Sequence, residues 1–161
     1  MPELFDIPAV NEFIRESNLI EGVDDAGADR AALRAYLHLL EHERLNLNNI
    51  LDTHLALLKD IDMRIAGKLR NCNVRVGNRM CPDWSLVPKL LDAWFMNHAR
   101  ANTEDTIKKA HIAFEKIHGF EDGNGRLGRI IINWQRTKAR PQLSVLIIKA
   151  SERQEYYRWF K

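Results

Sequence analysis

The sequence predicts a mainly α-helical fold, and three observations support this prediction. Apolar residues recur three or four positions apart along most of the chain, as they do on one face of a helix. Only one short stretch, near residue 75, shows the alternation typical of a strand. The 161 residues are 45% hydrophobic and 29% charged, and they contain no internal repeat and no low-complexity linker. We therefore expect one domain over residues 1–161, built around a single core.

Three helices are expected before residue 67. The first covers about residues 8–22, because Pro8 suits the first turn of a helix. The second begins near Asp29, which can act as its N-cap, and the third runs from Leu47 and stops near Gly67. The residues with helical spacing are Val10, Phe13, Ile14 and Ser17 in the first, Leu33, Tyr36, Leu37 and Leu40 in the second, and Ile50, Leu51, His54, Leu58, Ile61 and Ile65 in the third.

The segment over about residues 69–82 has a different pattern. Residues 74–76 read Val-Arg-Val, so apolar and polar side chains alternate there. Residues 77–78 read Gly-Asn, which favours a tight turn between two strands. A short β-hairpin is therefore predicted, with Met80 on its returning strand.

Helices resume in the second half of the chain. They are expected over Ser85–Ala99, from Asn102 to Ile117, and from Arg126 to about Lys138. Residues 143–148 are apolar and fit either an extended or a helical segment. Ser151, followed by a Gln three positions later, resembles a capping box for a last helix that ends at Lys161.

Composition excludes several classes of protein. The formal net charge is only +2 and the basic residues are scattered, so no nucleic-acid partner is expected. No run of about eighteen apolar residues occurs, so no membrane span is expected. The first thirteen residues lack the order of a secretory signal, and the cysteines Cys72 and Cys81 are expected to be reduced thiols. These features favour a cytoplasmic location.

The residues from His118 to Arg129, HGFEDGNGRLGR, carry groups suited to transfer from a nucleotide. The segment lies between two expected helices, and its last residues open the second helix, whose N-terminal amides suit a phosphate. Gly123 and Gly125 let the main chain approach an anion closely and adopt positive φ. Arg126 and Arg129 are three residues apart on the first turn, so both can face one polyphosphate.

Asp122 and His118 supply the other groups that such a transfer needs. Asp122 adds a carboxylate beside the phosphate cradle, where a Mg²⁺ that bridges two phosphates requires a protein oxygen. His118 can act as a general base near neutral pH. Glycines in this segment also spell the dinucleotide fingerprint G-x-G-x-x-G. A helix precedes them where a strand is required, and Lys149 lies near the position of the required acid, so no Rossmann site is expected.

The segment from His118 to Arg129 resembles the signature of the Fic family, H-x-F-x-[DE]-G-N-G-R-x-x-R, and matches every defined position. Gly119 stands where many family members have Pro. Residues 67–88 resemble the flap hairpin of the family, and residues 149–157 resemble its C-terminal helix. The resemblance covers nearly the whole chain and implies a single helical Fic-type domain with a short β-hairpin flap.

The resemblance also implies a role for each motif residue. The family's motif histidine deprotonates the target hydroxyl, so His118 is the expected catalytic base, while Phe120 anchors the loop and Asp122 binds Mg²⁺. The residues expected to bind the phosphates of ATP are Gly123, Asn124, Gly125, Arg126 and Arg129, with Arg129 on the γ-phosphate. The flap residues expected to pair with an extended target segment are Val74, Arg75, Val76 and Gly77.

A second motif lies near the N-terminus. Residues Ser17 to Gly22, SNLIEG, resemble the inhibitory signature [ST]-x-x-x-E-[GN] of one class of the family. Ser17 and Glu21 are four residues apart, so they would share one face of a helix. Glu21 is expected to form a charge-assisted pair with Arg129 where the γ-phosphate should bind, which would leave ATP in an unproductive pose.

The resemblance implies a protein adenylyltransferase that moves AMP from ATP to a Ser, Thr or Tyr hydroxyl of a target protein, with Mg²⁺, under autoinhibition by Glu21. Three alternatives stay open: the same site removes AMP from a modified target, transfers another phosphate-containing group, or only binds nucleotide as a non-catalytic regulator. A homo-oligomer is compatible with the sequence. His54 is interpreted as a packing or surface residue, and Tyr156 as a core residue or part of an adenine pocket.

Overall fold

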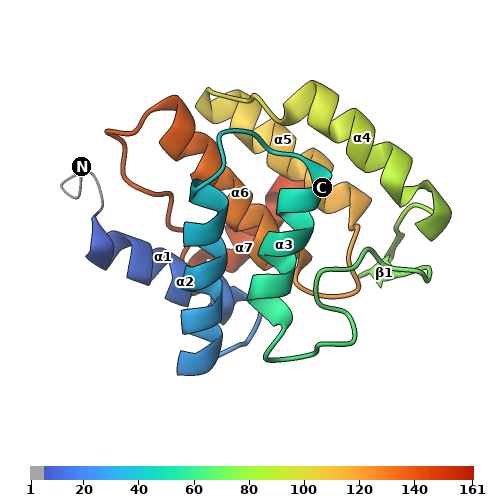
Figure 1. Ribbon diagram of the computed structural model, residues 1–161, viewed down its shortest axis with the longest axis horizontal. Helices are drawn as coiled ribbons and strands as arrows, with labels where there is room; N and C mark the ends of the chain where they lie inside the picture. The colour runs from blue at the N-terminus through green and yellow to red at the C-terminus, as the bar shows by residue number, and fades with distance from the viewer. Residues whose placement is uncertain (1–5) are drawn as a thin grey trace.

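The computed structural model describes residues 6–161, and helices form most of it (Figure 1). Residues 1–5, which belong to the segment considered for a secretory signal, lie outside this range. The α-helices are α1 (Ile7–Ile20), α2 (Ala26–Leu40), α3 (Leu47–Leu58), α4 (Val87–His98), α5 (Glu104–Ile117), α6 (Asn124–Ala139) and α7 (Arg153–Tyr157). Short 3₁₀ turns are η2 (Trp84–Leu86), η3 (Ala150–Glu152) and η4 (Arg158–Phe160). The predicted mainly α-helical class is confirmed.

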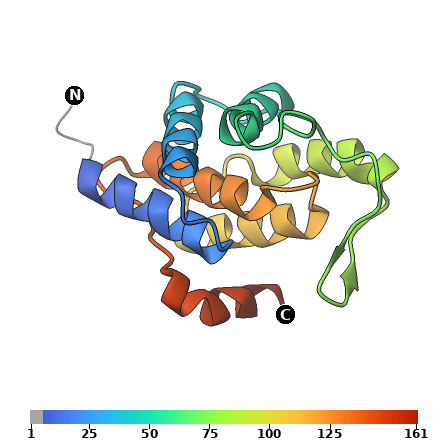
Figure 2. The same cartoon turned by 90° about the horizontal axis from the view of Figure 1, so that it is seen from below.

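The predicted hairpin is present as two short antiparallel strands, β1 (Arg75–Val76) and β2 (Arg79–Met80). Arg75 pairs with Met80, and Val76 pairs with Arg79. Gly77, in the turn between the strands, has φ +56°, a conformation that favours glycine. Figure 2 shows the hairpin projecting from one end of the helical body, on the same side as the C-terminal helix.

Helix α6 forms the centre of the core and contacts α1, α2, α3 and α5. Its side chains Leu127, Ile130 and Ile131 are buried. They pack in one apolar cluster with Tyr36 of α2 and Phe114 of α5. Because α6 is enclosed in this way, the loop that precedes it rests on a rigid support.

The ends of the first two helices differ from prediction. α1 ends at Ile20, so Glu21 is its C-cap and does not lie within the helix. α2 begins at Ala26, because the side chain of Asp25 caps it by accepting a hydrogen bond from the Ala28 amide. The predicted N-cap Asp29 is therefore wrong, since it lies inside the first turn.

The third helix is shorter than its apolar pattern predicts. α3 ends at Leu58, and Ile61, expected on its buried face, is 53% exposed. The chain then turns back, and the Gly67 amide donates a 2.9 Å hydrogen bond to His54 Nδ1. Gly67 has φ +71°, and a Cβ on it would lie 3.0 Å from Leu55 Cβ, so the return requires glycine.

The second half follows the prediction with shifted helix ends. The helix expected at Asn102 starts at Glu104, with Thr103 as N-cap in a capping box. α6 begins at Asn124, two residues before its predicted start. The capping box predicted at Ser151 is wrong, because Ser151 lies within η3 and no side chain caps α7.

The helices and the cysteines can each be compared with the sequence predictions. Within residues 6–161, no helix combines the length and the apolar content that a membrane crossing requires. Cys72 is exposed, Cys81 is buried, and both are free thiols.

Candidate active site

The loop between α5 and α6 holds its shape through one buried amide side chain. Asn124 Oδ1 accepts a hydrogen bond from the Phe120 amide at 3.0 Å, and Asn124 Nδ2 donates to the Phe120 carbonyl at 2.8 Å. Both residues are buried. The side chain of Asn124 is therefore occupied within the loop, and only its main-chain N–H remains for the phosphate contact predicted from the sequence.

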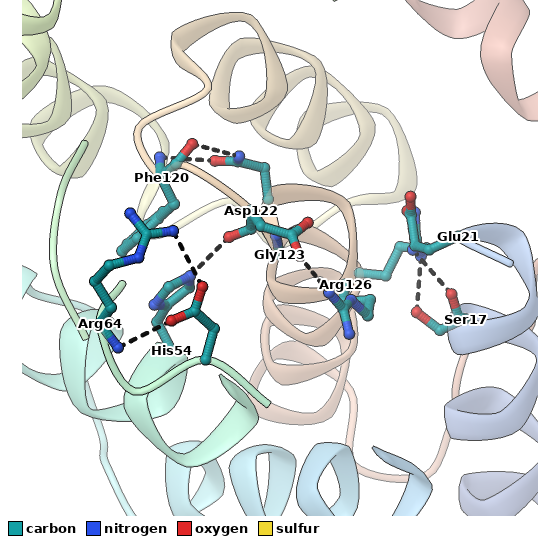
Figure 3. Close-up of polar contacts among 11 residues, drawn as sticks. Ser17, Glu21, His54, Arg64, Phe120, Asp122, Gly123 and Arg126 are labelled. Atoms are coloured by element: carbon teal, nitrogen blue, oxygen red, sulfur yellow. Dashed lines mark hydrogen bonds and ion pairs between the residues drawn. The ribbon is translucent and has the colours of Figure 1, made fainter. Parts of the chain in front are cut away.

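His54 supports the loop from α3, which the sequence did not indicate. Because His54 Nδ1 accepts from the Gly67 amide, the neutral ring carries its proton on Nε2, which donates to the Asp122 carbonyl at 2.8 Å. The ring also stacks on Phe120, with centroids 4.0 Å apart. Figure 3 shows the hydrogen bond between His54 and Asp122 as a dashed line. Burial lowers the pKa of His54 to about 4, so the ring is neutral at pH 7.

Acid is expected to destabilise the fold through such buried histidines. The folded pKa of His54 is about 4 and its ordinary value is 6.5, so the unfolded chain binds more protons between these two values. Its contribution to the free energy of unfolding is complete above pH 6.5 and is lost as the pH falls toward 4. Burial likewise lowers the pKa of His111 to about 3.

Urea unfolding over this pH range tests the expectation. The free energy of unfolding should decline on acidification, and the decline should be shallower in His54→Gln, because glutamine cannot be protonated there. An identical decline in wild type and variant would contradict the role given to His54.

The N-terminus of α6 is open toward the loop. Its first intrahelical hydrogen bond runs from the Leu127 amide to the Gly123 carbonyl, so the amides of residues 124–126 precede it. Among the described residues, no side chain caps this end, and Gly123 has φ +83°. Free amides and the positive end of the helix dipole make this a place for an anion.

Asp122 and Arg126 lie side by side at this open helix end (Figure 3). Asp122 Oδ1 accepts from the Gly123 amide at 2.7 Å, and its Oδ2 lies 3.3 Å from Arg126 Nη2. The Asp122 side chain is 64% exposed, whereas that of Arg126 is buried and its Nε has no partner within residues 6–161. An exposed carboxylate and a buried guanidinium with an unpartnered Nε thus meet beside the first turn of α6.

Asp122 fits a Mg²⁺ that is shared with a nucleotide. No group of three or more metal-ligating side chains occurs in the part of the chain that the structure describes, so the protein alone offers no cage for a metal. Mg²⁺ commonly needs only one or two carboxylates, with phosphate oxygens and waters completing its shell. A single exposed carboxylate beside an anion site matches this requirement.

Arg129 is buried, and each of its three guanidinium nitrogens donates at least one hydrogen bond. Its Nε donates to Ser17 Oγ at 2.8 Å, Nη1 to Tyr156 Oη at 3.2 Å, and Nη2 to the Ser17 carbonyl at 3.0 Å. Nη2 also lies 2.6 Å from Glu21 Oε1. Figure 3 labels Ser17 and Glu21, which come from the end of α1. The structure thus brings together Ser17, Glu21 and Arg129 from opposite ends of the sequence, and it adds Tyr156.

The Glu21 carboxylate lies against the first turn of α6. A Cβ added to Gly125 would overlap Glu21 Oε1, so this glycine allows the carboxylate to approach the helix end. Gly22, the last residue of the motif, has φ +73°, which lets the chain leave α1 directly after Glu21. A negatively charged side chain therefore stands beside Arg129 near the open helix end.

A cleft of about 920 Å³ lies between the flap, the loop and the C-terminal helix. Of the residues predicted for the site, those that line it are Glu21, Val76, Gly77, His118, Gly125 and Arg129. Tyr156, Tyr157 and Phe160 form an aromatic wall. Val74, Arg75, Asp122 and Arg126 are not among its lining residues. The cleft is thus bordered by the Arg129 guanidinium, the His118 imidazole and an aromatic surface.

His118 faces the cleft from the C-cap of α5 with a left-handed main chain, φ 49° and ψ 57°. Such a conformation costs a non-glycine residue about 1–3 kcal/mol and persists where its surroundings enforce it. Burial, Arg70 and Arg79 lower the pKa of His118, so its imidazole is neutral at pH 7 and can accept a proton. Burial raises the pKa of the neighbouring Glu115 to about 7.

Comparison with solved structures identifies the fold. A Fic domain containing signalling protein from Bacteroides thetaiotaomicron superposes with a TM-score of 0.77 at 17% identity, over 98% of this chain and 74% of that one. A Fic family protein from Desulfovibrio desulfuricans gives a TM-score of 0.74 at 21% identity, over 99% and 57% of the two chains.

Curated relatives and a family model agree with the structural comparison. The protein adenylyltransferase fic-1 of Caenorhabditis briggsae is 32% identical over 149 residues, 89% of this chain and 28% of the relative. The protein adenylyltransferase Fic of Drosophila grimshawi is 29% identical over 84% of this chain and 29% of the relative. The chain thus spans less than a third of the length of these relatives. The Fic/DOC family model matches residues 44–135, and the chain belongs to this family.

Proposed function

We propose that this protein transfers AMP from ATP to a hydroxyl side chain of a target protein, and that Glu21 keeps the reaction slow. The observation that carries the proposal is the Glu21 carboxylate, which lies 2.6 Å from Arg129 beside the open N-terminus of α6. A carboxylate there stands where the same cationic groups would receive a phosphate. The names of the relatives, protein adenylyltransferases, support AMP as the transferred group.

Residues in and beside the cleft have separate roles in the proposed reaction. His118 takes the proton from the target hydroxyl, whose oxygen forms a bond with the α-phosphorus of ATP. The bond from that phosphorus to the bridging oxygen breaks, and pyrophosphate leaves. Arg129 binds the γ-phosphate, and the amides of residues 124–126 bind oxygens of the phosphate chain. The flap pairs with the target segment, as an exposed strand edge can.

Mg²⁺, when bound, neutralises charge on the phosphates. Asp122 is the residue that would hold it, with its exposed carboxylate at the helix end. Arg126, 3.3 Å from Asp122, would contact the phosphate chain from the same side. These two residues therefore orient the nucleotide, while His118 moves the proton.

Inhibition follows from competition for Arg129. While Glu21 pairs with Arg129, the γ-phosphate cannot bind that cation. The negative charge of the Glu21 carboxylate also repels the phosphate. Without Glu21, Arg129 keeps its hydrogen bonds to Ser17 and Tyr156, so the guanidinium stays in place. Removing Glu21 should therefore free the site without disordering it.

Glu21→Gly is expected to raise the rate at which label from α-labelled ATP enters protein by about tenfold or more, because a charge-assisted contact is worth about 1.5–3 kcal/mol. A cell lysate supplies the targets, so the assay does not require a known substrate. Mg·ATP is kept at a saturating concentration. Glu41→Gly is the matched control, since Glu41 is the exposed C-cap of α2 and lies outside the cleft. Equal rates for Glu21→Gly and wild type would refute the inhibitory role.

A further inference from the structure

Arg70 is a buried arginine whose guanidinium, within residues 6–161, binds only main-chain carbonyls. It is 3% exposed. Its Nη1 donates to the Cys72 carbonyl at 2.9 Å, and its Nη2 donates to the Pro82 carbonyl at 2.6 Å. Its Nε donates to the His118 carbonyl at 2.6 Å, and Nη2 also reaches the Ile117 carbonyl at 3.3 Å. One side chain thus joins the two ends of the flap to the C-terminus of α5.

This arrangement requires a guanidinium. The last carbonyls of a helix lack intrahelical partners and carry partial negative charge, so a cation suits them. Five donors in a planar fork reach carbonyls in different directions at once, which the single ammonium of a lysine cannot do. Within residues 6–161, none of the hydrogen-bond partners of Arg70 is a carboxylate. The positive charge of Arg70 therefore stabilises main-chain carbonyls and, in this range, does not form a hydrogen-bonded ion pair.

The carbonyl that Arg70 Nε binds belongs to His118, which has positive φ. The Arg70 amide also donates to the Gly119 carbonyl at 3.0 Å. Two successive peptide groups, those after His118 and after Gly119, are thereby fixed by one residue. Because the imidazole of His118 projects from this fixed segment, its direction depends on Arg70.

The flap depends on the same residue. Its strands have two residues each and are exposed, and so short a hairpin is not rigid by itself. Its base is closed by the Cys81 amide, which donates to the Val74 carbonyl at 3.1 Å, and Arg70 binds carbonyls just outside that closure. Arg79 adds a 3.3 Å hydrogen bond from the flap to the Lys116 carbonyl, at an exposed position.

We infer that Arg70 is a positioning residue for the transfer reaction, because it fixes the flap and the main chain of His118 to each other. The inference rests on the proposed function. A target segment paired with the flap is then held at a set distance from the imidazole. The hydroxyl of that segment is therefore already positioned next to the His118 base.

Charge supports this arrangement. Arg70 and Arg79, both from the flap segment, lower the pKa of His118, whereas Glu21 of α1 has the opposite effect. Glu115, one turn before His118 on α5, also lines the cleft. Loss of the Arg70 charge should therefore raise the pKa of His118. Because the base acts in its neutral form, the acid limb of the pH–rate profile should move to higher pH.

Arg70→Gln and Arg70→Lys, each in the Glu21→Gly background, test the inference. Both are expected to lower kcat about 10²-fold, the size of effect typical of a misplaced catalytic group. The KM for ATP should stay within about twofold, because Arg70 does not line the cleft. The acid limb should move to higher pH in Arg70→Gln and stay in place in Arg70→Lys, which keeps the charge. Arg34→Gln is the control, an exposed arginine paired with Asp60.

Two measurements need no activity and separate this inference from the proposed function. NMR titration should give His118 a higher pKa in Arg70→Gln than in the parent, and hydrogen exchange at the Cys81 amide should be faster. If the parent shows no transfer but both changes occur, the positioning role holds and the proposed function fails. If both signals match the parent, or if kcat is unchanged in Arg70→Lys, the inference is overturned. Should Arg70→Gln not fold, Arg70→Lys decides the question.

Discussion

His118→Ala, made in the Glu21→Gly background, is expected to lower AMP transfer by about 10²–10⁴-fold, the usual contribution of a positioned general base. The neutral imidazole lines the cleft and is the group suited to accept the target's proton. ATP affinity should change little, because the proposed phosphate contacts come from the end of α6 and from Arg129. The measurements are the rate of label transfer and the dissociation constant for Mg·ATP in the same protein.

The control for this change is His98→Ala, which removes a half-buried imidazole at the end of α4, outside the cleft. It should transfer at the rate of the parent. Near-full activity in His118→Ala would show that another group accepts the proton. A large loss of ATP affinity would instead assign His118 to nucleotide binding.

Arg129→Ala is expected to have the second large effect, because two proposed roles meet in one guanidinium. Loss of the γ-phosphate contact should weaken productive ATP binding by about 1.5–3 kcal/mol, as for a hydrogen bond to a charged group. The same change removes the partner of Glu21, which lies 2.6 Å away. Glu21→Gly should therefore increase the rate strongly when Arg129 is present and hardly at all when it is absent.

A double-mutant cycle on the transfer rate measures this coupling with four proteins. Residues in direct contact show non-additive effects, whereas separate sites add. Because Arg129 is buried and binds Ser17 and Tyr156, its removal leaves polar groups unpaired. Far-UV circular dichroism and a thermal melt should therefore accompany the kinetics. Additive effects in folded proteins would place the action of Glu21 elsewhere.

The sequence predicted the parts of the site that local patterns encode. His118 to Arg129 are contiguous, so the spacing of the loop and the following helix could be read directly. Pairing of Glu21 with Arg129 followed from two motifs of one family, although 108 residues separate them. The structure contains that pair and the short hairpin.

The missed contacts involve the main chain. His54 binds the Asp122 carbonyl and the Gly67 amide, and the Arg70 guanidinium binds four main-chain carbonyls. Every residue has a carbonyl and every residue except proline has an amide N–H, so no side-chain pattern identifies the partners. A histidine within the otherwise apolar face of α3 was the one available signal for His54. Similarly, the bonds from the Asn124 side chain to Phe120 depend on the curvature of the loop, so the sequence predicts a phosphate contact for Asn124 but not these bonds.

The end of α3 shows a second limit of periodicity. Apolar residues continue at helical spacing to Ile65, yet the helix stops at Leu58. Two acidic residues, Asp60 and Asp62, lie near the negative end of the helix dipole, which disfavours its extension. Ile65 is buried all the same, since the chain turns back against α3. A residue can thus keep its place in the core after the helix that would have carried it has ended.

If this site transfers AMP, the α-phosphate of ATP and not the γ-phosphate should become attached to the target protein. Glu21→Gly should be incubated with Mg²⁺ and a lysate, once with α-labelled and once with γ-labelled ATP. Label is expected in protein from the α-position and not from the γ-position, and the α-signal should be lost in Glu21→Gly/His118→Ala. Transfer of the γ-label, or no transfer of either label by folded Glu21→Gly protein, would contradict it.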